Sequence, residues 1–476
     1  MRRRRDGVTG RQSMPDYEVV VVDGVKTGGV SHWHQQLGLP TIAEPLPGDR
    51  SADVCIVGGG LTGLWAAYYL SEADPTLDIV VLEAEFIGYG ASGRNGGWLS
   101  AELPGSRATY ARGPGGVAAV DRLGAELADS VDRVIDVCRT HDIDADVAKN
   151  GVLYVATSRA QLARLQADRP GPGSRIQVLD ADESAARVRV DGVLGSLLDP
   201  QCARVQPAKL VRGLADVVRS RGVRIHEQSA VLGIEPGRAI CETGTVTAPV
   251  VLQCLEGYTP TLRGQRRTWL PMNSAMVVTE PLPPDVWAEL GWDGRELLGD
   301  LANAYFYAQR TADDRIALGG RGRPYRFASA TDVDGVTQAW TIRSLRETLE
   351  RAFPRLRGVP LDHAWCGVLG VPRDWCASVS LDPRTGLGFA GGYVGSGLTA
   401  TNLAGRTLRD LALGERTDLT GLAWTNRPVR RWEPEPLRWL GVHGMYALYR
   451  AADRREIAGL DHPSRLGRLA NRLSGR

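Results

Sequence analysis

Several absences in the sequence narrow its function before any motif is considered. The chain of 476 residues has only three lysines, so that almost all of its positive charge is arginine. Its seven cysteines form no C-x-x-C pair, and no histidine or cysteine spacing suits a metal. We therefore expect reduced thiols, no disulfide scaffold and no bound metal. A Gly-x-Ser-x-Gly motif is also missing, which leaves hydrolase chemistry without support.

Long hydrophobic segments are missing as well. The charge-free run Val54–Leu70 has 17 residues and includes four glycines, so it is too short and too glycine-rich for a membrane span. The Arg2–Arg5 run resembles the start of a signal peptide, but no apolar stretch follows it. These observations predict a cytoplasmic protein.

Positive charge gathers at the two ends of the chain. Residues 1–11 carry five Arg against one Asp, and residues 426–476 carry eleven Arg against five acidic residues. Because the whole chain has a net charge of only +2, the body between these ends is acidic. An acidic body argues against nucleic-acid binding. The basic tail is most simply a solvated helical extension, and contact with an anionic membrane surface is the alternative.

A glycine motif early in the chain points to a dinucleotide. The apolar run Asp53–Val57 predicts a buried parallel strand and leads directly into Gly58-x-Gly60-x-x-Gly63. In such a motif the first glycine makes the turn, the second lets the backbone approach a pyrophosphate, and the third lets helix and strand pack closely.

The segment after the motif completes a βαβ unit. A helical stretch runs to Leu70, and the apolar strand Asp78–Leu82 ends at Glu83, whose carboxylate can accept hydrogen bonds from ribose hydroxyls. This order predicts dinucleotide binding but leaves NAD and FAD open. Two glycine-dense loops, 88–97 and 395–399, could both follow a bound cofactor, although ordinary surface loops explain them too.

The remaining pattern alternates helices and strands. Residues 15–50 predict an irregular lead-in, so that His32 and His34 are expected to be solvent or packing residues. Strands dominate between residues 268 and 376. Helical patterning occurs over 117–140, 158–169, 207–220 and 338–353, from the segment 395–400 to about Leu413, and in the tail after Pro436.

At this point the sequence resembles a known family. The segments that carry the resemblance are residues 52–70, 90–97, 257–260, 310–311 with 319–322, and 391–397 with 401–405. They are similar to the FAD-dependent oxidoreductases of the D-amino-acid oxidase superfamily, which includes glycine and sarcosine oxidases. The chain looks most similar to the gamma-glutamylputrescine oxidase-like branch.

The resemblance implies an α/β fold with two domains. A Rossmann-type FAD-binding domain would be joined to a discontinuous α+β substrate domain built on a mostly antiparallel sheet. The implied FAD-binding domain comprises residues 51–105, 198–265 and 378–416. The substrate domain would comprise 106–197 and 266–377, with an N-terminal arm over 1–50 and a basic helical extension over 417–476.

The resemblance also implies roles for particular residues. Those expected on the pyrophosphate and adenosine are Gly58, Gly60, Leu61, Thr62, Gly63, Glu83, Ala84 and Val231. Those expected along the ribityl chain and the flavin are Ser92, Asn95, Gly96, Gly97, Gly395, Gly397, Leu398 and Thr399. No catalytic residue is evident, and the candidates for the substrate pocket are Tyr305, Tyr307, Arg321 and Trp365.

Three positions depart from the pattern of the family. Ser396 stands where many relatives have His, and Glu256 stands where a small or amide residue is expected. Some sarcosine oxidases attach their flavin covalently near Cys366, but the alignment places Gly367 on the attachment position. We therefore expect FAD to be bound without a covalent bond.

The resemblance implies oxidation of a C–N bond in a small amine or amino acid. A hydride would pass to flavin N5, the imine would hydrolyse, and oxygen would reoxidise the flavin to give hydrogen peroxide. One alternative is a dehydrogenase that passes electrons to a quinone or carrier. Another is a flavoprotein subunit without turnover.

Overall fold

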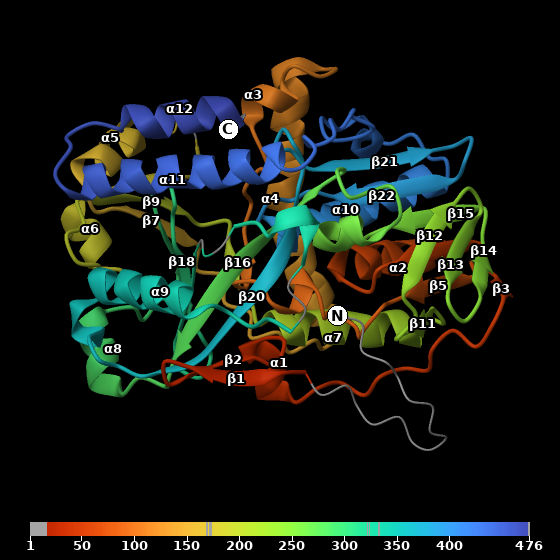
Figure 1. Cartoon of the computed structure of the whole chain (residues 1–476), viewed down its shortest axis with the longest axis horizontal. Helices are drawn as coiled ribbons and strands as arrows, with labels where there is room; N and C mark the ends of the chain where they lie inside the picture. Colours follow the sequence, from red (N-terminus) through yellow and green to blue (C-terminus); the bar gives the residue numbers. More distant parts are fainter. Residues whose placement is uncertain are drawn as a thin grey trace.

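Two large sheets and the helices that cover them make up the protein (Figure 1). The computed structural model describes residues 17–167, 170, 174–320, 322, 324–331 and 334–474. The mixed α/β architecture predicted from the sequence is confirmed.

The first sheet has six strands, of which five run parallel. Its central strands are short and almost wholly apolar, because both faces of the sheet are buried: helices cover one face, and residues 239–248 pack against the other. The sixth strand pairs antiparallel at one edge. In spatial order the strands are β11 (Arg224–His226), β5 (Ile79–Leu82), β4 (Val54–Val57), β15 (Val250–Gln253), β22 (Leu387–Gly391) and β21 (Ser378–Asp382).

Four helices share a core with this sheet. A Cβ atom at Gly405 would lie 2.6 Å from Cβ of Trp65, so the two helices that carry these residues pack very closely. The four helices are α2 (Leu61–Ala73), α4 (Gly116–Thr140), α7 (Pro207–Ser220) and α10 (Gly397–Ala412). Their bounds agree with the helical patterns in the sequence.

The second sheet has ten strands and is mostly antiparallel. Helices α8 (Pro284–Leu290) and α9 (Ala339–Ala352) contribute to its core. The sequence predicted α9 but not the short α8. In spatial order the strands are β1 (Val19–Val22), β2 (Val25–Gly28), β20 (Leu361–Val371), β16 (Leu270–Thr279), β19 (Ile316–Gly320), β18 (Tyr307–Arg310), β17 (Leu297–Asp300), β7 (Val152–Ala156), β9 (Gly195–Asp199) and β8 (Gln177–Leu179).

The expectation of an irregular lead-in over 15–50 was wrong. Strands β1 and β2 form a hairpin through Asp23 and Gly24, which both have positive φ, and β2 pairs with β20 of the large sheet. Asp-Gly between two apolar runs is a strong hairpin signal. Helix α1 (His32–Leu37) follows, and both its histidines are buried, so they are packing residues.

Smaller elements complete the described part of the chain. A four-stranded sheet contains β12 (Val231–Glu235), β13 (Arg238–Cys241), β14 (Thr245–Thr247) and β3 (Arg50–Ser51), and β10 (Ala203–Arg204) pairs with β6 (Trp98–Leu99). The remaining helices are α3 (Arg107–Tyr110), α5 (Arg159–Ala167), α6 (Ala181–Ala185), α11 (Leu437–Ile457) and α12 (Arg465–Ser474). Within the described ranges, none of the helices has both the length and the apolar character needed to cross a membrane.

Candidate cofactor and substrate site

A cavity of about 760 Å³ connects the six-stranded sheet with the ten-stranded sheet. Residues from the ends of β4 and β5, the loop over residues 88–97, β20 and the start of α10 line it. Cavities of this volume hold a single large ligand. The structure therefore brings together segments that lie more than 300 residues apart in the sequence.

The glycine motif forms one end of the cavity. Gly58 has φ +113°, and a Cβ atom there would lie 2.5 Å from the carbonyl oxygen of Cys254. A Cβ atom at Gly63 would lie 2.1 Å from the carbonyl oxygen of Gly58, so Gly63 packs helix against turn. Gly63 does not line the cavity, because it lies beneath the turn, and its expected contact with a pyrophosphate is not supported.

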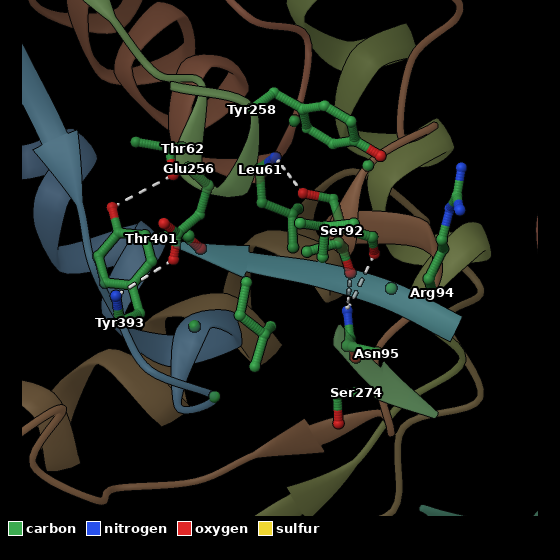
Figure 2. A pocket seen from close by; sticks show the side chains of 18 of the residues that line it. Leu61, Thr62, Ser92, Arg94, Asn95, Glu256, Tyr258, Ser274, Tyr393 and Thr401 are labelled. Atoms are coloured by element: carbon green, nitrogen blue, oxygen red, sulfur yellow. Dashed lines mark hydrogen bonds between the residues drawn. The ribbon is translucent and has the colours of Figure 1, made fainter. Parts of the chain in front are cut away.

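The start of α2 is exposed to the cavity. Near a Cβ atom added at Gly60, the described residues place only the Ser92 side chain within 4 Å, at 2.9 Å to its hydroxyl oxygen. That hydroxyl accepts a hydrogen bond from the Leu61 amide at 2.8 Å, as Figure 2 shows. At the next residue of the helix, the Thr62 hydroxyl lies 3.2 Å from the Tyr393 hydroxyl. The second glycine of the motif thus leaves open space where a pyrophosphate would approach.

Glu83 stands at the end of β5 beside the same space. Its carboxylate accepts hydrogen bonds from the Gly59 amide at 2.7 Å and from the Glu85 amide at 3.0 Å. Burial raises the pKa of Glu83 to about 7, and the two amides oppose this shift. Ala84 and Val231 line the cavity as well.

The loop over residues 88–97 is held by α1, which the sequence did not predict. Ser31 donates to the carbonyl oxygen of Gly93 at 2.7 Å, and the Trp33 indole donates to that of Asn95 at 2.8 Å. Nε2 of His34 lies 3.2 Å from the carbonyl oxygen of Gly88. The N-terminal segment therefore fixes the shape of this loop.

Four residues of this loop were expected to contact the cofactor, and three of them line the cavity. Ser92, Asn95 and Gly96 line the cavity. Gly97 does not, because its Cα atom faces the protein interior, where a Cβ atom would lie 2.2 Å from Nε2 of Gln309. The expectation that Gly97 contacts the ribityl–flavin stretch is therefore not supported.

The start of α10 forms another part of the lining. Gly395, Gly397 and Leu398 line the cavity, and next to Gly395 no described atom lies within 4 Å of an added Cβ. Thr399 does not line the cavity, because the turn of the helix carries its side chain into the core, and Thr401 lies on the lining instead. Ser396 donates a hydrogen bond to the Glu102 carboxylate at 3.1 Å.

Polar and aromatic side chains gather at the opposite end, which we call the substrate end. Its residues are Trp98, Glu102, Tyr154, Ser274, Asp300, Tyr305 and Tyr307. The Tyr154 hydroxyl donates to Glu102, and the hydroxyls of Tyr307 and Ser274 lie 3.0 Å apart. Burial raises the pKa of the Asp300 carboxyl to about 7. Both tyrosines expected in the pocket, Tyr305 and Tyr307, are in this group.

The other two pocket candidates have different outcomes. Arg321 lies outside the described residues. Trp365 is fully buried away from the cavity, because the Arg94 segment and α1 cover this stretch of β20. Its indole donates to the carbonyl oxygen of Arg94 at 2.8 Å and packs against Trp33. Trp365 therefore belongs to the core and not to the substrate pocket.

Two neighbouring residues of β20 lie on opposite faces of the strand. Gly367 lines the cavity, whereas the Cys366 thiol is directed to the other face, 3.8 Å from the carbonyl oxygen of Val336. Burial is one of the conditions that keep a cysteine unreactive. The geometry agrees with the alignment, which put glycine on the attachment position.

Glu256, which departs from the family pattern, is a structural link beside the cavity. Its carboxylate accepts hydrogen bonds from the Gly392 and Tyr393 amides, both at 3.1 Å, and Figure 2 shows the bond from Tyr393. Burial raises its pKa to about 7, while these amides and that of Gly370 lower it. Glu256 thereby ties the end of β15 to the loop that leads into α10.

Sequence reasoning missed several residues of the lining. The charged side chains among them are Glu85, Arg94, Glu102, Glu256 and Asp300. Asp300 ends a buried strand, and such a position is a signal that could have drawn attention to it. Arg94 lies in the loop 88–97 that was expected to follow the cofactor, and its position there is the signal that was overlooked. Glu102 carries no local signal, because only the folded chain brings it to the cavity.

The residues present fit an FAD molecule. The glycine motif leaves room for backbone approach, Glu83 lies beside it, and the start of α10 presents open space about a helix N-terminus. A helix N-terminus favours negative charge, which suits a phosphate or the pyrimidine edge of a reduced flavin. Both glycine-rich segments open into one continuous cavity.

Comparisons with known proteins agree with this site. Residues 53–411 match the family model described as FAD dependent oxidoreductase. The chain is 31% identical to "Gamma-glutamylputrescine oxidoreductase" of Escherichia coli K12, over 77% of this chain and 84% of that protein. It is 30% identical to "Probable oxidoreductase OrdL" of Rhizobium meliloti, over 79% and 86%.

A solved structure shows the same fold. Glycine oxidase from Geobacillus kaustophilus superposes with a TM-score of 0.65 at 20% identity, covering 80% of this chain and all of that one. Fold, cavity and family model agree. This chain therefore belongs to the family of FAD-dependent oxidoreductases that the sequence pattern predicted, and FAD is its cofactor.

Proposed function

We propose that the protein oxidises a C–N bond of an amine, that the imine product hydrolyses in water, and that oxygen is the electron acceptor and gives hydrogen peroxide. Bound FAD would supply the two-electron acceptor that takes the hydride at N5. The observation that carries the proposal is the aromatic and acidic substrate end, which opens from the same cavity as the glycine motif.

The FAD contacts that we propose are the predicted residues that line the cavity. They are Gly58, Gly60, Leu61, Thr62, Glu83, Ala84, Ser92, Asn95, Gly96, Val231, Gly395, Gly397 and Leu398. The Cys366 thiol faces away from the cavity, which supports binding without a covalent bond.

The residues of the substrate end would bind and orient the amine. The nitrogen that reacts must be neutral, because its lone pair stabilises the developing cation. Aromatic walls from Trp98, Tyr154 and Tyr307 exclude water, which lowers the pKa of an enclosed amine. This mechanism needs no dedicated protein base.

The acidic side chains favour a substrate with a second, charged nitrogen. Asp300 and Glu102 both line the substrate end, and an ammonium group can pair with either carboxylate. The relative from Escherichia coli is named for a putrescine derivative, which agrees with an amine as substrate. We therefore place amines with a second basic nitrogen ahead of amino acids.

Three four-carbon compounds test this proposal, and each is mixed with holoenzyme without oxygen. They are 1,4-diaminobutane, butylamine and 4-aminobutanoate. All three have a primary amine at one end, and the other end carries a positive charge, no charge or a negative charge. We expect the flavin to be reduced fastest by 1,4-diaminobutane, and peroxide to form when air is admitted. If none of the three, nor gamma-glutamylputrescine, reduces the flavin, the proposed reaction is wrong.

A second candidate is a dehydrogenase that delivers electrons to a quinone at a membrane surface. The observation that favours it is α12, where the exposed Leu469 and Leu473 stand among exposed arginines. Such a helix can lie on anionic lipid. Rapid reoxidation of the reduced enzyme by oxygen, without sedimentation on phosphatidylglycerol vesicles, would exclude this candidate.

A further inference from the structure

The loop between β17 and β18 forms a thin partition between the substrate end and the C-terminal helices. Asp300, Leu301, Ala302 and Tyr305 of this loop line the cavity. On its other side lie α11 and α12, which run side by side near α5 (Figure 1). These two helices follow the family match, which ends at residue 411.

One carboxylate of α11 holds the centre of this loop. Asp453 accepts hydrogen bonds from the Asn303 amide at 2.8 Å, from the Asn303 side-chain nitrogen at 2.8 Å and from the Ala304 amide at 2.9 Å. Hydrogen bonds to an ionised acceptor are the stronger kind. The backbone of two consecutive loop residues is thus fixed by a side chain some 150 residues further along the chain.

Neighbouring contacts reinforce this attachment. Glu456, whose side chain is 3% exposed, pairs with Arg164 through bonds of 2.6 and 3.0 Å. Arg164 in turn donates to the carbonyl oxygen of Leu301 at 2.8 Å. From α12, Gly467 approaches so closely that an added Cβ atom would lie 2.6 Å from Oδ1 of Asn303.

We propose that Asp453 is a positioning residue for substrate binding: the C-terminal helix pair fixes the 300–305 loop and thereby sets the position of Asp300 and Tyr305 in the cavity. The proposal rests on the proposed function in one respect, namely that the substrate occupies this end. The tail is then part of the active-site architecture, and two of its few acidic side chains, Asp453 and Glu456, hold that wall.

The test compares variants of the full-length holoenzyme. Asp453→Ala on α11 removes the three hydrogen bonds. Gly467→Ala on α12 pushes the Asn303 side chain away without removing a charge. Asp461→Asn is the matched control, because Asp461 lies on the same tail but pairs with the exposed Arg159, away from the loop. Hydrogen exchange of the 300–306 amides and steady-state kinetics with 1,4-diaminobutane are measured for each.

We expect Asp453→Ala and Gly467→Ala each to speed amide exchange at residues 303 and 304 about tenfold, and to raise KM about tenfold with kcat within about twofold. FAD occupancy should not change, and the control should match the wild type. Unchanged exchange in both variants would overturn the attachment. Faster exchange with an unchanged KM would overturn the role in substrate binding.

The two proposals fail in different ways. If wild-type flavin is not reduced by any amine, the proposed function is wrong, and the exchange measurement still decides whether the tail holds the loop. If wild-type enzyme is active and Asp453→Ala lowers kcat and FAD occupancy together, the residue has a general structural role and the positioning proposal is wrong.

Discussion

Replacing Gly60 with alanine tests the cofactor site with a single methyl group. Gly60 has φ −81°, which alanine adopts without strain, so the effect is confined to the space in front of the backbone. The new methyl group would lie 2.9 Å from the Ser92 hydroxyl, which must shift away from the Leu61 amide. It would also occupy the space that we assign to the pyrophosphate.

The size of the effect follows from these contacts. Overpacking by one methyl group costs about 1–3 kcal/mol, which corresponds to about a 5- to 150-fold weaker binding of FAD. Apoprotein titrated with FAD, followed by quenching of flavin fluorescence, gives the dissociation constant directly.

The control is Gly124→Ala in α4, where the described structure has no atom within 4 Å of the added Cβ. That variant should bind FAD like the wild type and gain about 0.5–1 kcal/mol of stability from helix propensity. If Gly60→Ala binds FAD within about twofold of the wild type, the assignment of this loop to the pyrophosphate is refuted.

Three further predictions concern other parts of the cavity. Glu83→Ala should weaken FAD binding by about 1.5–3 kcal/mol in the same titration, because ribose hydrogen bonds to a carboxylate are lost; an unchanged constant would exclude that contact. Gly397→Leu should lower the flavin reduction potential by about 20–45 mV, because the side chain displaces the α10 N-terminus. Gly397→Ala, whose Cβ would meet nothing closer than 3.7 Å, should leave the potential unchanged. Equal potentials of Gly397→Leu and wild type in a redox titration would show that α10 does not face the ring. Asp300→Asn should raise KM for 1,4-diaminobutane about tenfold but not for butylamine. Since burial raises the pKa of Asp300 to about 7, its carboxyl is neutral below that pH, and the wild-type KM for the diamine should fall as the pH rises through 7. In the variant this fall should be shallower, because only the deprotonation of the reacting amine remains.

The cofactor half of the site was predictable because local sequence determines it. The strand, the glycines of 58–63 and the acid at 83 depend on contacts within one βαβ unit, and their spacing carries the information. The glycines that did not reach the cavity, Gly63 and Gly97, are needed for close packing instead. Sequence spacing cannot separate a glycine that faces a ligand from one that faces the protein.

Most of the substrate half was not predictable, for the opposite reason: Tyr305 and Tyr307 were expected there, but Tyr154 and the acidic side chains were not. Tyr154 and Asp300 meet through the pairing of β7 with β17, and Glu102 reaches Tyr154 from the segment after β6. Trp365 belongs to a strand that lines the cavity from Gly367 to Leu369, but its own side chain is covered by α1, a helix in the segment predicted to be irregular. An error near the N-terminus thus produced an error at residue 365.

The central claim is that this chain binds FAD and uses it to oxidise an amine. Its most direct test is the absorbance spectrum of the purified holoenzyme during anaerobic titration with 1,4-diaminobutane. The account predicts a yellow protein whose long-wavelength flavin band bleaches with increasing diamine and returns when oxygen is admitted. A protein that carries flavin but keeps its full absorbance with this diamine, butylamine and gamma-glutamylputrescine alike would contradict it.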